Sequence, residues 1–220
     1  MAKFIIQPHG RLNDWVADEK GYFREAGLDY AFNVEGSRKS TPRLAGVDSP
    51  AALKDSLFGA FERYAEGLGR KGEGAGDVSC ACHWTVNQAA KVKEGIMWGK
   101  AYSVCESAIV VPGDSKVSEP RHLAGIEIAV GYHSGSHYSA LQALEVFLSP
   151  ADVALKFIGT SWVRVDAALA QKIPAANVWG PELYLLEQHG FRRILSTTFM
   201  MAFLFPKDAD AGKVERYMRS

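Results

Sequence analysis

The sequence of 220 residues lacks an excess of either charge, a long apolar run and an even set of cysteines. Its 25 Lys and Arg balance 25 Asp and Glu, so the basic surplus of a nucleic-acid-binding protein is missing. No apolar run approaches the about 18 residues of a membrane helix. Three cysteines cannot form a complete disulfide framework. We therefore expect a folded globular protein that binds no nucleic acid and is not inserted in a membrane.

The first residues lack the features of an export signal. The stretch MAKFIIQPHG contains one lysine and a four-residue apolar segment that meets Pro8. That segment is shorter than the apolar region of a signal peptide, and it lacks a cleavage site. We expect a cytoplasmic protein. The alternative is a periplasmic protein whose export signal has been removed from this sequence.

Short apolar segments alternate with helical patterns along the chain. Strands are predicted at 3–7, 28–34, 77–84, 126–130, 155–158 and 175–180, with a long extended segment at 101–115 and a strand within 193–204. Helices are predicted at 13–26, 48–68, 86–94, 138–147, 162–171 and 182–189, and a last one is expected to begin within 207–220. This alternation predicts an α/β fold with parallel sheets and right-handed crossovers. Ligands of such sheets bind beyond the carboxyl ends of the strands, so the turns at those ends are the places to inspect.

The turn GYHSGSH at 131–137 joins a predicted strand to a predicted helix. A helix N-terminus offers unpaired backbone N–H groups and a partial positive charge, which suit an anion. Its side chains could add hydroxyl donors and two imidazoles. The candidate ligand-binding residues here are His133, Ser134, Gly135, Ser136 and His137. The alternative is an ordinary serine N-cap with no ligand.

The segment DVSCACHW places thiols and an imidazole near the end of another predicted strand. If that strand ends near Cys82, then Cys82, His83 and Trp84 reach the binding region. A thiol beside a histidine can be activated as a nucleophile, and Cys105 is a second candidate. The candidate catalytic residues are therefore Cys82, His83, Cys105 and His137. Small buried residues that pack a strand are the alternative for the cysteines, and the spacing predicts no metal site.

Three further turns contribute candidates for ligand binding. His9 and Arg11 follow the first strand, and the planar guanidinium suits carboxylate, sulfonate or phosphate oxygens. Arg164 is a candidate anion partner, or else it pairs with a nearby carboxylate. Trp179 and Glu182 lie at a strand end, where the indole could stack on a planar ligand or pack into the core. Sequence spacing predicts no cofactor-binding motif.

Several segments, in matching order, resemble a known family. WVADEKGYFREAGLDY (15–30) resembles the first helix of the type II periplasmic binding proteins. HLAGIEIAVGYHSGSH (122–137) is similar to the entry into their second lobe, and VDAALAQKIPAANVWGPE (165–182) is similar to a later element. The subgroup that it resembles binds aliphatic sulfonates, nitrate, taurine or thiamine-pyrimidine precursors.

The resemblance implies a two-lobe clamshell, in which each lobe is a mostly parallel sheet flanked by helices. Lobe 1 would comprise residues 1–105 plus 197–220, and lobe 2 residues 106–196. Two extended crossovers, near 105–111 and 197–205, would join the lobes. The candidate residues above would then line the cleft between them.

Two functions remain open on this fold, since a fold does not settle function. The first is a domain like a solute-binding protein, related to ABC transporters, that holds a small anionic or heteroaromatic ligand. The second is a cytoplasmic enzyme with a cysteine nucleophile or a histidine acid/base, resembling a desulfinase or a biosynthetic lyase or hydrolase. We expect a small-molecule ligand and no cofactor. A homodimer is a minor alternative, in which a second subunit covers apolar sheet surface.

Overall fold

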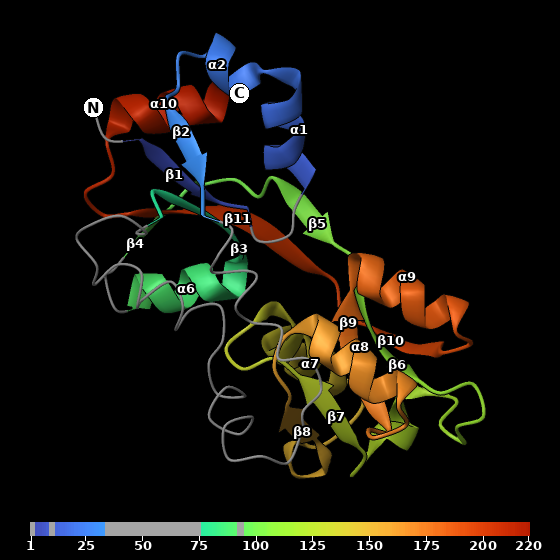
Figure 1. Ribbon diagram of the computed structural model, residues 1–220. Helices are drawn as coiled ribbons and strands as arrows, with labels where there is room; N and C mark the ends of the chain where they lie inside the picture. Colours follow the sequence, from blue (N-terminus) through green and yellow to red (C-terminus); the bar gives the residue numbers. More distant parts are fainter. Residues whose placement is uncertain (1–2, 9–11, 34–75, 92–94) are drawn as a thin grey trace. The chain divides into compact units, whose positions relative to one another are not determined.

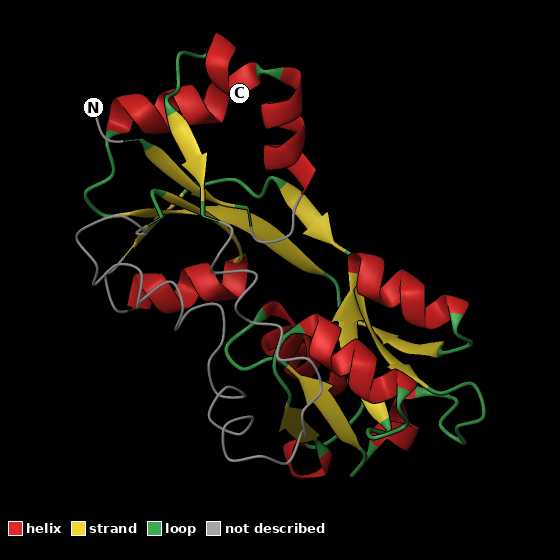
Figure 2. Ribbon diagram, viewed as in Figure 1, coloured by secondary structure: helices red, strands yellow, loops and turns green. Residues whose placement is uncertain are grey.

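The computed structural model describes residues 3–8, 12–33, 76–91 and 95–220, which form two units with a sheet in each (Figures 1 and 2). The first unit contains the described residues up to 102 together with 201–220, and the second contains 103–200. The helix expected at 48–68, and most of the glycine-rich segment after it, lie outside the described residues.

The first unit is built on a mixed sheet. Its elements are β1 (Phe4–Gln7), α1 (Leu12–Lys20), α2 (Tyr22–Glu25), β2 (Tyr30–Phe32), β3 (Val78–Cys82), α6 (His83–Lys91), β4 (Gly95–Met97), β11 (Phe199–Pro206, whose first two residues belong to the second unit) and α10 (Ala211–Arg219). The strand order is β2-β1-β3-β11-β4, and β5 (Ser103–Cys105) pairs with β11 beside this path. β1 runs parallel to β2 and β3, whereas β11 runs antiparallel to β3 and β4.

The two faces of this sheet are covered by different helices. Alternate residues of β3 point to opposite faces. Val78 and Cys80 pack in the core on the side of α1, α2 and α10, and Ala81 packs on the side of α6 (Figure 1). The α1–α2 segment was predicted as one helix over 13–26, but Gly21, with φ of +81°, interrupts it. Gly27 ends it in the left-handed conformation, as predicted.

The second unit carries the other sheet, in the order β10-β6-β9-β7-β8. Its elements after β5 are β6 (Ser107–Val111), the one-turn 3₁₀ helix η1 (Pro120–Leu123), β7 (Glu127–Val130), α7 (Gly135–Leu144), η2 (Pro150–Asp152), β8 (Ala154–Phe157), α8 (Ser161–Leu169), β9 (Ala175–Trp179), α9 (Gly180–Gln188) and β10 (Arg192–Ser196). β7 runs parallel to β8 and β9, and β6 runs antiparallel to β9 and β10.

Alternate side chains of β6 point to opposite faces of this sheet and pack against different helices. Ala108 and Val110 pack with α8 and α9, while Ile109 and Val111 pack with α7 and η1, and all four side chains are fully buried. The predicted α/β fold with two sheets is confirmed. The extended segment expected at 101–115 divides into β5 and β6, and the strand expected within 193–204 divides into β10 and β11. Among the helices of the described ranges, none combines the length and apolarity of a membrane span.

Candidate functional site

Three helices of the second unit begin at one edge of its sheet. α7 follows β7, α8 follows β8 and α9 follows β9 (Figure 1). Because these three strands are parallel, their carboxyl ends meet at the same edge, and so do the N-termini of the three helices. Each helix start presents backbone N–H groups and the positive end of the helix dipole. This edge is therefore electrostatically suited to an anion.

The turn between β7 and α7 is shaped by its own serines. Ser134 Oγ donates to the Gly131 carbonyl at 2.7 Å, and the Gly131 N–H donates to Ser136 Oγ at 2.9 Å. The two hydroxyl oxygens lie 2.8 Å apart. A Cβ atom on Gly135 would lie 2.6 Å from the ring of Phe199, so only glycine fits there. The serine hydroxyls thus hold the turn in shape through bonds to each other and to Gly131.

Arg164, on α8, lies directly against this turn and is completely buried. A Cβ atom on Gly131 would lie 3.0 Å from Arg164 Nη1. The guanidinium donates from Nε to the Asn177 carbonyl in β9 at 3.0 Å, and from Nη1 to the carbonyls of Ile158 and Gly159, just after β8, at 3.2 Å and 2.9 Å. Its buried Nη2 has no hydrogen-bond partner among the described residues. The hydrogen-bonding capacity of the guanidinium is therefore only partly used.

The charge of Arg164 is only partly compensated by its surroundings. Burial lowers its pKa to about 9, and the carboxylate of Glu182 acts in the opposite direction. The guanidinium therefore stays charged at neutral pH. Glu182 is itself buried and accepts a hydrogen bond from Ser161 Oγ at 2.5 Å. No ion pair joins Arg164 to a carboxylate within the described part of the chain. The alternative that Arg164 pairs with a nearby carboxylate is thus not what this part of the structure contains.

One aromatic ring, that of Trp179, packs against the guanidinium, and a second ring packs against Trp179. The Arg164 Cζ atom lies 5.2 Å from the centroid of the Trp179 ring, at cation–π distance. Phe199 packs edge-on against Trp179, with ring centroids 5.9 Å apart. Trp179 therefore packs on the Arg164 guanidinium, and its stacking on a planar ligand stays a prediction. Its ring lowers the local dielectric around that charge.

The histidines of the turn belong to an aromatic stack. His133 lies 3.8 Å from Tyr132 between ring centroids, and His137 lies 4.6 Å from Tyr138. His137 also meets Phe157 edge-on at 4.9 Å. Burial, aided by the charge of His133, lowers the pKa of His137 to about 4, so its imidazole is neutral at pH 7. Its Nδ1 is buried and has no hydrogen-bond partner in the described ranges.

The predicted catalytic thiols are all buried. Cys82 ends β3, and its Sγ lies 3.2 Å from Thr85 Oγ1 in the first turn of α6. Cys105 Sγ contacts the Glu106 carbonyl at 3.8 Å. Cys80 donates to the carboxylate of Asp14 at 3.0 Å, and burial raises the pKa of this thiol well above its usual range. Asp14 is a buried acceptor for Cys80 and Tyr217.

The predicted site residues fall into three groups. His133, Ser134, Gly135, Ser136, His137, Arg164, Trp179 and Glu182 all lie in the second unit, at the ends of its parallel strands. His83 and Trp84 begin α6 in the first unit, with ring centroids 4.5 Å apart. His9 and Arg11 lie outside the described residues. Sequence reasoning missed Asn177, a fully buried polar residue within the apolar strand β9. Its position in that strand was the available signal, because a buried amide needs partners.

This architecture is similar to that of solved periplasmic binding proteins. The chain matches the periplasmic aliphatic sulphonate binding protein SsuA from Escherichia coli with a TM-score of 0.64 at 15% identity, over 99% of this chain and 68% of that one. It matches the arginine-, lysine-, histidine-binding protein ArtJ from Geobacillus stearothermophilus with a TM-score of 0.60 at 14% identity, over 99% and 88% of the two chains. The chain has a type II periplasmic-binding-protein-like fold. This confirms the resemblance seen in the sequence.

A third match adds a bound molecule to the comparison. The alkanesulfonate-binding protein SsuA from Xanthomonas axonopodis pv. citri, bound to MOPS, has a TM-score of 0.56 at 16% identity, over 100% of this chain and 70% of that one. No family model and no curated protein matches the sequence. The type II periplasmic-binding-protein-like fold is thus shown by structure, and the ligand has to be argued from the site.

Proposed function

We propose that this chain binds a small organic anion at the 131–137 turn, as a domain like a solute-binding protein. The observation that carries this proposal is Arg164, a fully buried guanidinium with an unused N–H, which lies against Gly131 at the beginning of the turn. Burying a charge without an ion partner is costly unless something compensates it. An anion on the adjacent helix start would do so, because it adds negative charge close to the guanidinium.

The surroundings of the turn favour an oxyanion over a neutral ligand. Three helix N-termini and the Arg164 guanidinium lie at this edge and are opposed in part by the carboxylate of Glu182. The serine hydroxyls of the turn are already engaged with each other and with Gly131. The neutral imidazole of His137 lies in the same turn and adds no charge of its own at pH 7. Sulfonate, phosphate and carboxylate groups share this requirement for several converging donors.

The aromatic stack beside the turn suits the rest of such a ligand. Tyr132, His133, Tyr138 and Phe157 surround His137 with flat faces and edges. Flat or apolar groups pack well against such rings. An anionic head with a compact aliphatic or heterocyclic body is therefore the ligand class that we propose. The matched aliphatic sulphonate binding protein from Escherichia coli and the matched protein bound to MOPS support this choice.

The enzyme alternative receives no support from the site. All three thiols are buried, and Cys80 donates a hydrogen bond to the carboxylate of Asp14. Cys82 and Cys105 each have a close oxygen neighbour in the adjacent part of the chain. A catalytic thiol needs access for its substrate, and the two candidates Cys82 and Cys105 are only 5% and 2% exposed.

A thermal-shift screen followed by calorimetric titration tests the proposal. The probes are ethanesulfonate, MOPS, ethylphosphonate and butyrate, with N-propylmorpholine, which lacks the sulfonate, as the control for MOPS. We expect saturable binding of one or more anions, with affinity that falls as ionic strength rises, and no binding of N-propylmorpholine. Equal binding of N-propylmorpholine and MOPS, or no binding of any anion at low salt, would contradict the proposal.

A further inference from the structure

Asn177 occupies an unusual position at the centre of β9. It is completely buried in the second unit, and its side chain uses both its donor and its acceptor. The amide Nδ2 donates to the Ser136 carbonyl at 2.9 Å, in the first turn of α7. The amide Oδ1 accepts from Ser107 Oγ at 2.8 Å and from Thr197 Oγ1 at 2.9 Å. One side chain therefore connects the proposed anion-binding turn with two other segments.

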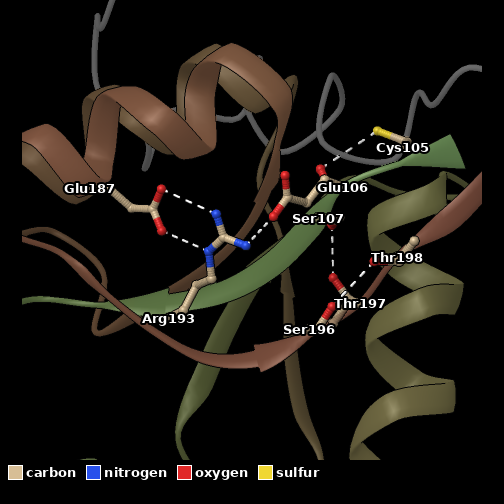
Figure 3. Close-up of polar contacts among 8 residues, drawn as sticks. All are labelled: Cys105, Glu106, Ser107, Glu187, Arg193, Ser196, Thr197 and Thr198. Atoms are coloured by element: carbon tan, nitrogen blue, oxygen red, sulfur yellow. Dashed lines mark hydrogen bonds and ion pairs between the residues drawn. The ribbon is translucent and has the colours of Figure 1, made fainter.

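Those two segments lead to the ends of the second unit. Within the described residues, the chain passes from one unit to the other between 102 and 103 and again between 200 and 201. Ser107 and Thr197 lie a few residues inside these two passages. The Thr197 N–H donates to the Ser107 carbonyl at 2.8 Å, and the two hydroxyls also lie 2.8 Å apart (Figure 3). These contacts, which we call the Ser107–Thr197 tie, join the two connecting segments. Both hydroxyls of the tie also donate to Asn177 Oδ1.

A second contact at the same place is exposed and serves as a comparison. Arg193 on β10 binds the carboxylates of Glu106 and Glu187, which come from the connecting segment and from α9 (Figure 3). Arg193 Nε lies 2.7 Å from Glu187 Oε1. These side chains are exposed to water, so the ion pairs contribute little. The buried bonds of Asn177 lie in a low dielectric and are the stronger link.

We propose that Asn177 is a positioning residue that couples the 131–137 turn to the connecting segments at Ser107 and Thr197. When the turn is well ordered, the bond from Asn177 to the Ser136 carbonyl holds the Asn177 side chain in place. Asn177 in turn stabilises the hydrogen bonds between Ser107 and Thr197. An anion bound at the turn therefore strengthens those hydrogen bonds. The anion half of this inference rests on the proposed function. The coupling itself belongs to the chain without ligand, so it can be tested separately.

The chemistry of the side chain explains why asparagine serves here. It offers a donor and an acceptor on one short planar group, and each points to a different segment. Aspartate would keep the acceptor for the two hydroxyls but lose the donor to Ser136. Serine is too short to span both sides. Asn177→Asp therefore cuts the link to the turn while it leaves the acceptor for Ser107 and Thr197.

The Thr197 amide is a direct reporter of the tie, because its N–H donates to Ser107. Its hydrogen exchange, measured by NMR, reports local opening of this bond. Ser136→Ala loosens the turn, because Ser136 Oγ accepts from the Gly131 N–H. We expect this variant to speed Thr197 exchange about tenfold in the wild-type background. In the Asn177→Asp background the same change should have almost no further effect. The exposed-pair control, Glu187→Gln, should leave both results unchanged.

If Ser136→Ala and Asn177→Asp change the exchange rate of the Thr197 amide additively, the proposed coupling is wrong. An exchange rate that does not change in Ser136→Ala would also overturn it. If Asn177→Asp does not fold, Thr197→Val takes its place, since it keeps the amide and the shape but removes the hydroxyl. Thr197→Ser, which keeps the hydroxyl, should retain the coupling.

The ligand half is tested by adding MOPS to the same samples. We expect MOPS to slow Thr197 exchange in the wild type but not in Asn177→Asp. Bound MOPS with unchanged Thr197 exchange would overturn this half of the inference. Absence of MOPS binding in calorimetry would count against MOPS as a ligand in the proposed function, and the variant cycle would still decide the coupling.

Discussion

Replacement of Arg164 by methionine separates its structural role from its electrostatic role. The guanidinium donates three hydrogen bonds to carbonyls, and Arg164→Met removes all of them. At about 1 kcal/mol for each bond, the loss of unfolding free energy would be about 3 kcal/mol. Removal of a buried, poorly compensated charge offsets part of this cost, so we expect a net loss of about 2 kcal/mol.

The electrostatic effect on an anion can be worked out separately. Arg164 lies against Gly131, so an anion on the turn would sit about 7 Å from its charge, worth about 2 kcal/mol at an effective dielectric of about 20. Glu182 opposes this field in part. We therefore expect Arg164→Met to weaken anion binding by about 1.5 kcal/mol, or roughly tenfold.

Arg192 provides a matched control for this prediction. It also donates three hydrogen bonds to carbonyls, those of Gly113, Ser115 and Val117, but it lies on β10 and is only partly buried. Arg192→Met should lower stability and leave affinity unchanged. The assays are urea denaturation and calorimetric titration with ethanesulfonate and MOPS at low salt. A folded Arg164→Met protein that binds these anions as tightly as the wild type would refute the reasoning.

Three further predictions concern other buried groups. Burial lowers the pKa of His137 to about 4, from an unfolded value near 6.5. Part of the free energy of unfolding is therefore lost as pH falls from about 6.5 to about 4. In denaturation curves, His137→Gln should reduce this acid-induced loss by up to ~2 kcal/mol. Tyr217→Phe removes a 2.7 Å bond to a buried carboxylate and should cost about 1–3 kcal/mol, whereas Tyr184→Phe, at a residue that is 63% exposed, should be silent by the same assay. Gly135→Ala adds a methyl group 2.6 Å from an aromatic ring, so it should lower the free energy of unfolding by about 1–3 kcal/mol and weaken anion binding. Gly99→Ala, whose methyl group would meet nothing within 4 Å, should change neither stability nor binding. Unchanged melting and titration curves for Gly135→Ala would contradict this prediction.

The alternation of apolar segments and helical patterns was enough to predict the α/β fold and most strand positions of the second unit. Strand ends were harder, because they depend on contacts that are distant in sequence. Glu106 separates β5 from β6. Thr197, which bonds to Ser107 and Asn177, lies between the end of β10 and the start of β11. The antiparallel strands of each sheet were not predicted, since periodicity carries no information on strand direction.

The candidate site was predicted in part, through the rule that ligands bind at the carboxyl ends of parallel strands. That rule selected the turn before α7 and the start of α9 correctly as neighbours of one sheet edge. It could not show that Arg164 is buried beneath the turn, because a helix position does not reveal which way a long side chain points. Asn177 was missed because a polar residue in an apolar strand signals a buried amide but does not show which groups that amide binds.

The most direct test of the anion site is a titration of ¹⁵N-labelled protein with ethanesulfonate, followed by backbone amide NMR. The account predicts saturable shifts at the amides of residues 134–137, with one dissociation constant that matches calorimetry and that increases about tenfold in Arg164→Met. Shifts that leave these amides untouched while calorimetry reports binding would place the anion elsewhere and contradict the account.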